Sequence, residues 1–275
     1  MVVQHNLTAA NTNRQLGITT SGLQKSTEKL SSGYKINRAA DDAAGLSISE
    51  KMRNQIRGLN KASDNAQDGI SLVQTAEGAL NEVHSMLQRM SELSVQAANG
   101  TNDTTDRSSI NDEIQQLKTE IERVGSTTQF NKMNILDGTF STGANKLLQV
   151  GANANQTIKV DIDALKSVVG SSLMAGLKTE TATNAQNAIT VVQNSIEKLS
   201  KLRSKLGAVQ NRLEHTVANL DNISENTQSS ESRIRDTDMA EEMVQYSKNN
   251  ILQQAGQSML AQANQANQGV LSLLQ

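Results

Sequence analysis

Residues 48–98 read ISEKMRNQIRGLNKASDNAQDGISLVQTAEGALNEVHSMLQRMSELSVQAA and contain no proline. The apolar residues of this segment recur at steps of three and four: Ile48, Met52, Ile56, Leu59, Ala62, Ala66, Ile70, Val73, Ala76, Leu80, Val83, Leu87 and Met90. The mean step is about 3.5 residues, the period of a left-handed coiled-coil seam. A single helix of this length cannot bury its own apolar stripe, so we predict that it packs against partner helices.

Two other segments show the same spacing. The first is Ile110, Ile114, Leu117, Ile121 and Val124, and the second is Ile189, Val192, Ile196, Leu199, Leu202, Leu206, Val209, Leu213, Val217, Leu220 and Ile223. Long seams toward both ends of the sequence indicate that the first and last long helices run in opposite directions and pack against each other. The predicted fold is therefore mainly α, an elongated antiparallel helical bundle or coiled coil.

The composition fits helix-on-helix packing. The 275 residues include no proline, cysteine or tryptophan and only two Phe and two Tyr, whereas a globular core normally buries more aromatic area. A net charge of −2 gives no electrostatic footprint for nucleic acid, and no apolar run reaches membrane-spanning length. The first residues lack the pattern of a Sec signal peptide, which indicates either a cytoplasmic protein or one secreted by another route.

The middle of the chain has a different character. Thr157–Ile162 alternates with period two, placing Ile158, Val160 and Ile162 on one face, and Asp137-Gly138 is a hairpin-turn signal. We therefore predict a small antiparallel β-hairpin element at about 128–165, followed by a loop over 163–182. Residues 99–106 form a turn that ends in candidate N-cap residues.

The two ends of the chain are weakly amphipathic and opposite in charge. Residues 1–40 carry Arg14, Lys25, Lys29, Lys35 and Arg38 against Glu28, and the segment from Asp236 onward carries Asp236, Asp238, Glu241 and Glu242 against Lys248. The second end has an apolar stripe of Ile251, Ala255, Met259, Ala263, Ala266, Val270 and Leu273. We expect the ends to pair with each other, the alternative being two independent disordered tails. In an isolated subunit they should be poorly ordered.

No pattern of catalytic or ligand-binding residues occurs. The histidines have no His or Cys partner at ligand spacing, and nucleotide-binding and zinc motifs are absent. The pair Asp41-Asp42 is best explained as helix capping at the start of the long helix. We predict a protein that is not an enzyme and has no cofactor or metal site.

A second set of residues lies away from the predicted seam. Arg89, Leu93 and Gln96 share a face of the long helix, and Glu113 lies beside the seam residue Ile114. Spacing alone leaves two interpretations open: an ordinary exposed leucine, or one anchor of an intermolecular patch.

Several ten-residue motifs resemble those of bacterial flagellins. Near the N-terminus these are residues 28–37, EKLSSGYKIN, and residues 39–48, AADDAAGLSI; near the C-terminus they are residues 206–216, LGAVQNRLEHT, and 232–241, SRIRDTDMAE, with the ending at 259–274. The resemblance covers about 1–160 and 185–275. Tyr34 and Lys35 stand where many flagellins have Leu and Arg.

The resemblance implies a minimal flagellin without variable outer domains. Its expected domains are a terminal coiled-coil domain (1–43 with 232–275) forming the inner core of a filament, and a rod domain (44–231) with the β element. The expected polymerisation residues are Leu7, Leu23, Leu30, Ile251, Met259, Val270 and Leu273.

The expected function is self-assembly into the extracellular flagellar filament for swimming, after export through the flagellar type III apparatus. The resemblance implies these partners: other copies of the chain, an export chaperone, the filament cap, hook–filament junction proteins and host Toll-like receptor 5. The residues matching the receptor contact region are Arg89, Leu93, Gln96 and Glu113. The alternatives are a hook–filament junction protein and a cytoplasmic coiled-coil adaptor.

Overall fold

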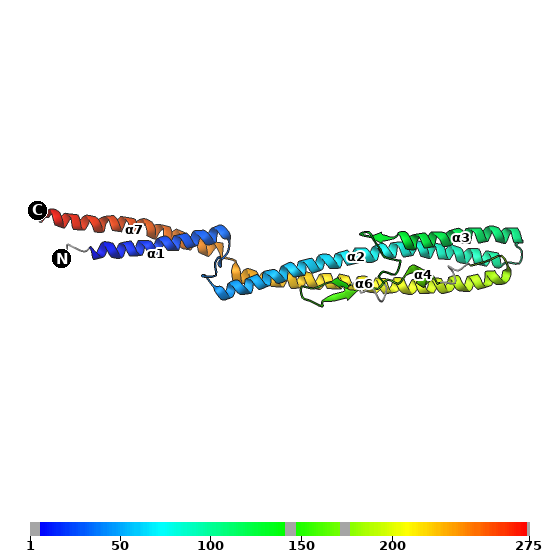
Figure 1. The fold of residues 1–275 in the computed structure, drawn as a ribbon. Helices are drawn as coiled ribbons and strands as arrows, with labels where there is room; N and C mark the ends of the chain where they lie inside the picture. Colours follow the sequence, from blue (N-terminus) through cyan, green and yellow to red (C-terminus); the bar gives the residue numbers. More distant parts are fainter. Residues whose placement is uncertain (1–5, 141–146, 171–176, 274–275) are drawn as a thin grey trace. The chain divides into compact units, whose positions relative to one another are not determined.

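The computed structural model describes residues 6–140, 147–170 and 177–273, with side chains described up to residue 265. Most of this chain is helical: α1 (Leu7–Ser32), α2 (Ala43–Ala98), α3 (Thr104–Thr127), α4 (Leu165–Val169), α6 (Ala182–Arg235) and α7 (Met239–Leu273) (Figure 1). The mainly α prediction is confirmed, and each long helix extends beyond its predicted seam.

The chain forms two compact units. The terminal unit comprises Met1–Ile56 and Glu225–Gln275, and the central unit comprises Arg57–Ser224. Both boundaries fall inside helices α2 and α6, whereas the sequence placed them near 43 and 231. The first turns of α2 and the last turns of α6 belong with the termini because they bond to the segment after α1, as the Lys35 N–H does to the Arg235 carbonyl at 2.7 Å.

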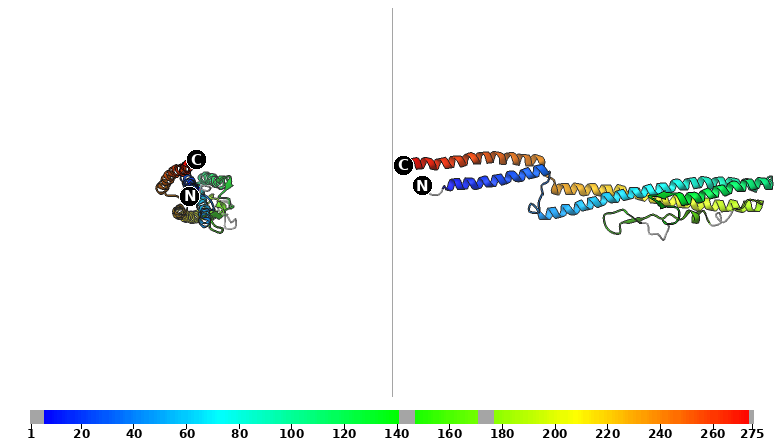
Figure 2. Two further views of the ribbon diagram at one scale, coloured as in Figure 1. Left: turned by 90° about the vertical axis from the view of Figure 1, so that its left-hand side faces the viewer. Right: turned by 45° about the horizontal axis from the view of Figure 1, so that its top comes forward.

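In the central unit, α2, α3 and α6 lie side by side (Figures 1 and 2). Hydrogen bonds between side chains fix the antiparallel register of α2 and α6. The Ser224 hydroxyl donates to Asn60 at 2.7 Å, and the Ser63 hydroxyl donates to Asp221 at 3.1 Å. The core contains the predicted seams of all three helices, with these residues fully buried: Leu80, Val83, Leu87, Met90, Ile114, Ile121, Val192, Leu199 and Leu206.

The predicted seams are too long at their outer ends. Ile48 and Ile223 are both exposed, while the neighbouring Ser49 and Ser224 are buried. At these ends serine occupies the buried position and forms a hydrogen bond through its hydroxyl group, as Ser224 does to Asn60. The isoleucine next to each serine therefore faces solvent. The seam is apolar only where a third helix or the β elements complete the core.

Two small antiparallel pairs confirm the β element. Strands β1 (Gln129–Phe130) and β2 (Met133–Asn134) form one, and β3 (Leu147–Gln149) and β4 (Thr157–Lys159) form the other. Ile158, Val160 and Ile162 are buried, as their alternation predicts.

The hairpin turn lies at Asn131-Lys132, not at Asp137-Gly138. Asn131 and Lys132 have φ values of 48° and 63°, the pair of positive angles that a type I′ turn requires. The two residues before Asp137, Ile135 and Leu136, are both buried, so the chain entering Asp137-Gly138 does not alternate as a half-buried strand would. Instead, the Asp137 carboxylate accepts a hydrogen bond from the Thr139 N–H at 2.8 Å, which lowers the pKa of that carboxyl group.

Part of the predicted loop at 163–182 is helical. Helix α4 buries Leu165, Val168 and Val169, and the Leu165 N–H bonds to the Leu136 carbonyl at 2.9 Å. Residues 171–176 of that predicted loop lie outside the described residues.

The predicted caps are present at two helix starts. Asp103 and Asp106 form a capping box at α3. The Asp42 carboxylate accepts from the Ala44 and Gly45 N–H groups at the start of α2, which satisfies donors that the first turn leaves free.

Candidate subunit interface

The terminal helices pair through a seam in which apolar and polar residues are mixed. Half-buried or buried residues recur at alternating steps of three and four on both helices: Ala9, Thr12, Leu16, Thr19, Leu23, Ser26 and Leu30 on α1, and Glu242, Tyr246, Asn249, Gln253, Gly256, Leu260 and Ala263 on α7. The two helices lie side by side in both views (Figures 1 and 2). Pairing of the ends, expected from their charges, is therefore present.

Three contacts along the seam show an antiparallel pair. Asn6 donates to the Ala263 carbonyl at 3.1 Å, Gln253 reaches Thr20 at 3.5 Å, and Lys29 forms an ion pair with Glu242 at 3.4 Å. The helices approach closely where glycine occurs: a Cβ at Gly256 would lie 3.3 Å from Leu16. Hydrogen bonds and small residues thus share the seam with its leucines, Leu16, Leu23, Leu30 and Leu260.

The apolar side chains of α7 lie mainly outside this seam. The exposed large residues are Met239, Met243, Val244, Ile251, Leu252 and Met259. This corrects the expectation that the stripe through Ile251 and Met259 joins the two ends. Ile251 and Met259 stay uncovered, whereas Ala263 of the same stripe lies in the seam.

The uncovered residues face more than one direction. Val244 and Ile251 are seven residues apart and lie along one line of the helix; Leu252 and Met259 lie along a second line, about 100° further round. A helix that is apolar on several sides is normally surrounded by partners. Together the two lines make an apolar face about 100° wide, broad enough to contact more than one neighbouring helix.

The predicted polymerisation residues fall into three groups. Leu7, Ile251 and Met259 are exposed, whereas Leu23 and Leu30 are half-buried in the α1–α7 seam. The side chains of Val270 and Leu273 lie outside the described residues. Val244 and Leu252 are not among the predicted residues, although their spacing of seven from Ile251 and Met259 is a periodic signal in the sequence.

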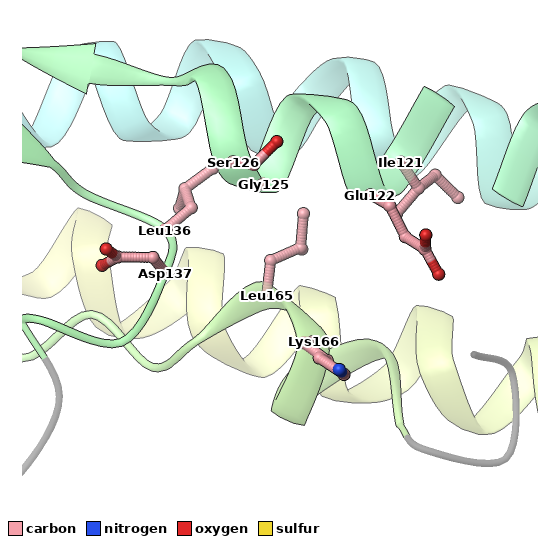
Figure 3. A pocket seen from close by; sticks show the side chains of 8 residues that line it. All are labelled: Ile121, Glu122, Gly125, Ser126, Leu136, Asp137, Leu165 and Lys166. Carbon is pink, nitrogen blue, oxygen red and sulfur yellow. The ribbon is translucent and has the colours of Figure 1, made fainter. Parts of the chain in front are cut away.

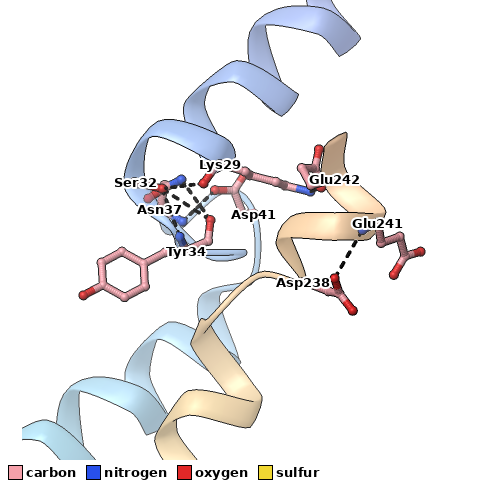
Figure 4. A network of polar contacts seen from close by, with 8 residues as sticks. All are labelled: Lys29, Ser32, Tyr34, Asn37, Asp41, Asp238, Glu241 and Glu242. Carbon is pink, nitrogen blue, oxygen red and sulfur yellow. Dashed lines mark hydrogen bonds and ion pairs between the residues drawn. The ribbon is translucent and has the colours of Figure 1, made fainter. Parts of the chain in front are cut away.

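The segment between α1 and α2 is held by a polar network (Figure 4). The Asp41 carboxylate accepts from the N–H groups of Arg38 at 2.9 Å and Asn37 at 3.2 Å, and these bonds lower the pKa of Asp41. The Tyr34 ring points away from the Lys29–Glu242 pair.

Two arginines hold the Tyr34 ring. The guanidinium carbons of Arg53 and Arg235 lie 5.2 and 4.8 Å from the ring centre, and Arg53 donates to the Tyr34 hydroxyl at 2.7 Å. Arg53 also forms an ion pair with the buried Glu231 at 3.1 Å. One aromatic side chain therefore ties α2 and α6 to the segment after α1.

On the central unit, the structure joins Arg89 and Glu113 across α2 and α3. The Arg89 Nε lies 3.0 Å from Glu113, and Arg89 also pairs with Glu92 at 3.3 Å; these carboxylates, Glu113 foremost, raise the pKa of Arg89. Gln96 is exposed on the same part of α2.

Leu93 is not on this surface: only 2% of it is exposed. Residues 72, 79, 86 and 93, spaced by seven, form a second partly or fully buried line beside the predicted seam. Because α2 packs against two helices, its buried face is wider than a two-helix seam. The exposed apolar residue nearby is Val95.

A pocket of about 320 Å³ lies between α3, α4 and the segment at Leu136–Asp137 (Figure 3). Leu165 projects from α4 toward α3, and the polar residues Glu122, Ser126, Asp137 and Lys166 also line the pocket. Among the described residues, no group of His, Cys, Asp or Glu is arranged to hold a metal ion, and no helix is long and apolar enough to cross a membrane.

Comparison with known proteins identifies the family. A family model for the bacterial flagellin N-terminal helical region matches residues 3–141, and one for the C-terminal helical region matches residues 189–274. The chain belongs to the bacterial flagellin family. Flagellins are structural subunits of the flagellar filament and not enzymes.

Two flagellins match over their whole length. The flagellin of Halalkalibacterium halodurans is 56% identical over 274 residues, and that of Bacillus subtilis is 52% identical over 303, with 100% of each chain covered in both cases. The crystal structure of Bacillus cereus flagellin is 33% identical, with a TM-score of 0.50, covering 57% of this chain and 88% of that one. The short interval between the two flagellin regions is thus shared with full-length relatives, as a minimal flagellin requires.

Proposed function

We propose that this flagellin is exported through the flagellar type III apparatus and polymerises outside the cell into a filament that drives swimming. The terminal unit supplies the inner contacts of the filament, and the central unit supplies the rod around it. Family membership supports the filament, and the uncovered surface of α7 supports the placement of the termini inside it.

One observation carries this proposal: α7 has two uncovered apolar lines that face different directions. A closed dimer buries one self-complementary patch on each subunit, whereas a helical polymer gives each subunit neighbours on several sides. Neighbours on several sides can therefore cover the Val244–Ile251 line and the Leu252–Met259 line together, and family membership favours a filament over a closed dimer.

The same surface accounts for the other assembly partners. Before assembly, a flagellin-specific export chaperone covers the apolar side of α7, because the free helix exposes Val244, Ile251 and Leu252 to water. The filament cap and the hook–filament junction proteins contact these termini at the two ends of the filament. The chain itself is a filament subunit and not a junction protein, so it extends filament seeds by repeated self-addition.

Seeded polymerisation tests the proposal. Val244→Ser/Ile251→Ser and Leu252→Ser/Met259→Ser should each block growth of the full chain on filament seeds, measured by sedimentation and negative-stain electron microscopy. Gln254→Ser/Gln257→Ser changes two exposed polar residues of the same helix and should polymerise normally. If disrupting only one line blocks association, a closed dimer explains α7 better than a filament.

The Arg89–Glu113 surface is the proposed contact for Toll-like receptor 5. Arg89, Glu113 and Gln96 form the contact, while the buried Leu93 holds α2 in place beneath them. In the filament these side chains face a neighbouring subunit, so the monomer presents them and the polymer hides them.

Binding of the monomer to the receptor ectodomain tests this surface. Arg89→Ala and Glu113→Ala should each weaken binding. The exposed Arg123–Glu120 pair on α3 provides the matched control, since Arg123→Ala removes a similar ion pair elsewhere. Equal affinity of the Arg89 and Arg123 variants would remove the receptor role of Arg89.

A further inference from the structure

Three of the nine methionines lie exposed on α7. Met239, Met243 and Met259 are 48%, 52% and 58% exposed, whereas Met90 is fully buried in the central core. Met259 belongs to the same uncovered line as Leu252, and Met243 is adjacent to Val244. The surface proposed for assembly is therefore rich in accessible thioethers.

We propose that these three methionines are sites of reversible oxidation that switch off assembly of the free subunit. This inference rests on the proposed polymerisation through α7. Beyond that proposal, it makes the oxidation state of the three methionines a control on whether a subunit can join the filament.

The oxidant is a peroxide. A sulfur lone pair attacks one oxygen of hydrogen peroxide, the O–O bond breaks, an S–O bond forms, and the other oxygen leaves as water after proton transfer. Sulfur loses two electrons and the peroxide gains them. Methionine sulfoxide is polar and is reduced again by methionine sulfoxide reductases.

The location of the thioethers determines the effect. A sulfoxide on α7 is exposed to water in the free subunit, so it changes the stability of the free subunit little. On assembly it must enter an apolar contact without a designed hydrogen-bond partner, so it opposes association. The covered thioether of an assembled subunit is shielded from peroxide, so free subunits are sensitive and filaments are resistant.

The test measures the critical concentration for seeded polymerisation of the full chain, before and after peroxide treatment. Peptide mass spectrometry counts the oxygen added at each methionine. Oxidation of the wild type should raise the critical concentration by at least about tenfold, the effect of losing roughly one apolar side chain's contribution. Treatment with the reductases should restore the original value.

Each variant is compared with its own untreated sample. The triple variant Met239→Leu/Met243→Leu/Met259→Leu should show no change on peroxide treatment. Met133→Leu is the matched control: Met133 is 40% exposed on β2, and its replacement should leave the response as large as in the wild type.

The outcomes separate the two proposals. If untreated protein fails to polymerise, the proposed filament function fails. If untreated protein polymerises and fully oxidised wild type does so at the same concentration, the oxidation inference alone is overturned. A triple variant as sensitive as the wild type, or a loss that the reductases do not reverse, would also overturn it.

Discussion

The guanidinium of Arg235, near the end of α6, lies 4.8 Å from the centre of the Tyr34 ring. With Arg53 of α2, it encloses the Tyr34 ring between two cations. A leucine could fill the space but would offer neither arginine a π face. Arg53 would also lose the hydroxyl that it now reaches at 2.7 Å.

Replacing Tyr34 should therefore loosen the segment after α1. Tyr34→Leu should lower the free energy of local opening by about 1–2 kcal/mol, because it loses both cation–π contacts. Tyr34→Phe keeps the ring and should lose less. Hydrogen exchange of the Lys35 amide, which bonds to the Arg235 carbonyl, reports this opening directly. Equally slow exchange in the leucine variant would contradict a role for the arginine contacts.

Leu93 and Val95 provide a test of which side of α2 is core. Leu93→Ala should destabilise the central unit by roughly 2–5 kcal/mol, because it leaves a cavity among buried residues. Val95, which is 56% exposed, should tolerate alanine within about 0.5 kcal/mol. Urea unfolding followed by circular dichroism distinguishes them. A receptor-binding loss in the Leu93 variant is interpretable only alongside that measurement.

The β1–β2 turn can be stabilised by glycine at one position. Lys132 has φ of 63°, which costs an L-residue about 1–2 kcal/mol relative to glycine. Lys132→Gly should therefore raise the stability of the central unit by about 1 kcal/mol. Asn131→Gly should gain less, since asparagine tolerates this conformation better. Thermal unfolding of the two variants compares them, and a larger gain at Asn131 would refute the assignment of strain.

Acid should loosen the segment around Asp41. Hydrogen bonds from the Arg38 and Asn37 N–H groups hold the pKa of Asp41 below its ordinary value of 3.8. When folding lowers the pKa of a carboxyl group, that group stabilises the fold at pH values above its unfolded-state pKa. This stabilisation is lost as the pH falls below 3.8 and through the folded-state pKa. The amide NMR shifts of Arg38 and Asn37 should titrate together in that range. Asp41→Asn should abolish the transition, and a midpoint above 3.8 would show that the bonds do not favour the carboxylate.

The helices of the central unit could be predicted because their apolar period is satisfied within one chain. Leu80, Leu87 and Leu206 belong to seams that the structure fills as expected. The second buried line through Leu93 could not be assigned, because spacing alone does not reveal how many helices α2 contacts. The turn at Asn131-Lys132 lacks the glycine that usually marks such turns, whereas Asp137-Gly138 has it but lies between buried residues.

The terminal helices were harder to interpret for a different reason. Only part of their apolar pattern forms the seam: Leu23 and Leu30 of α1 lie in it, whereas Ile251 and Met259 of α7 face outward. An apolar pattern indicates that a face is covered, and it does not identify which molecule covers it.

The proposed association of subunits through the outward-facing apolar side chains of α7 has a characteristic dependence on temperature. Removing them from water lowers the heat capacity, and the driving force that results weakens on cooling. Association between subunits of such a filament should be weakest at about 0 °C. Hydrogen bonds within each subunit, such as that from Asn6 to Ala263, should still hold α1 and α7 together at that temperature.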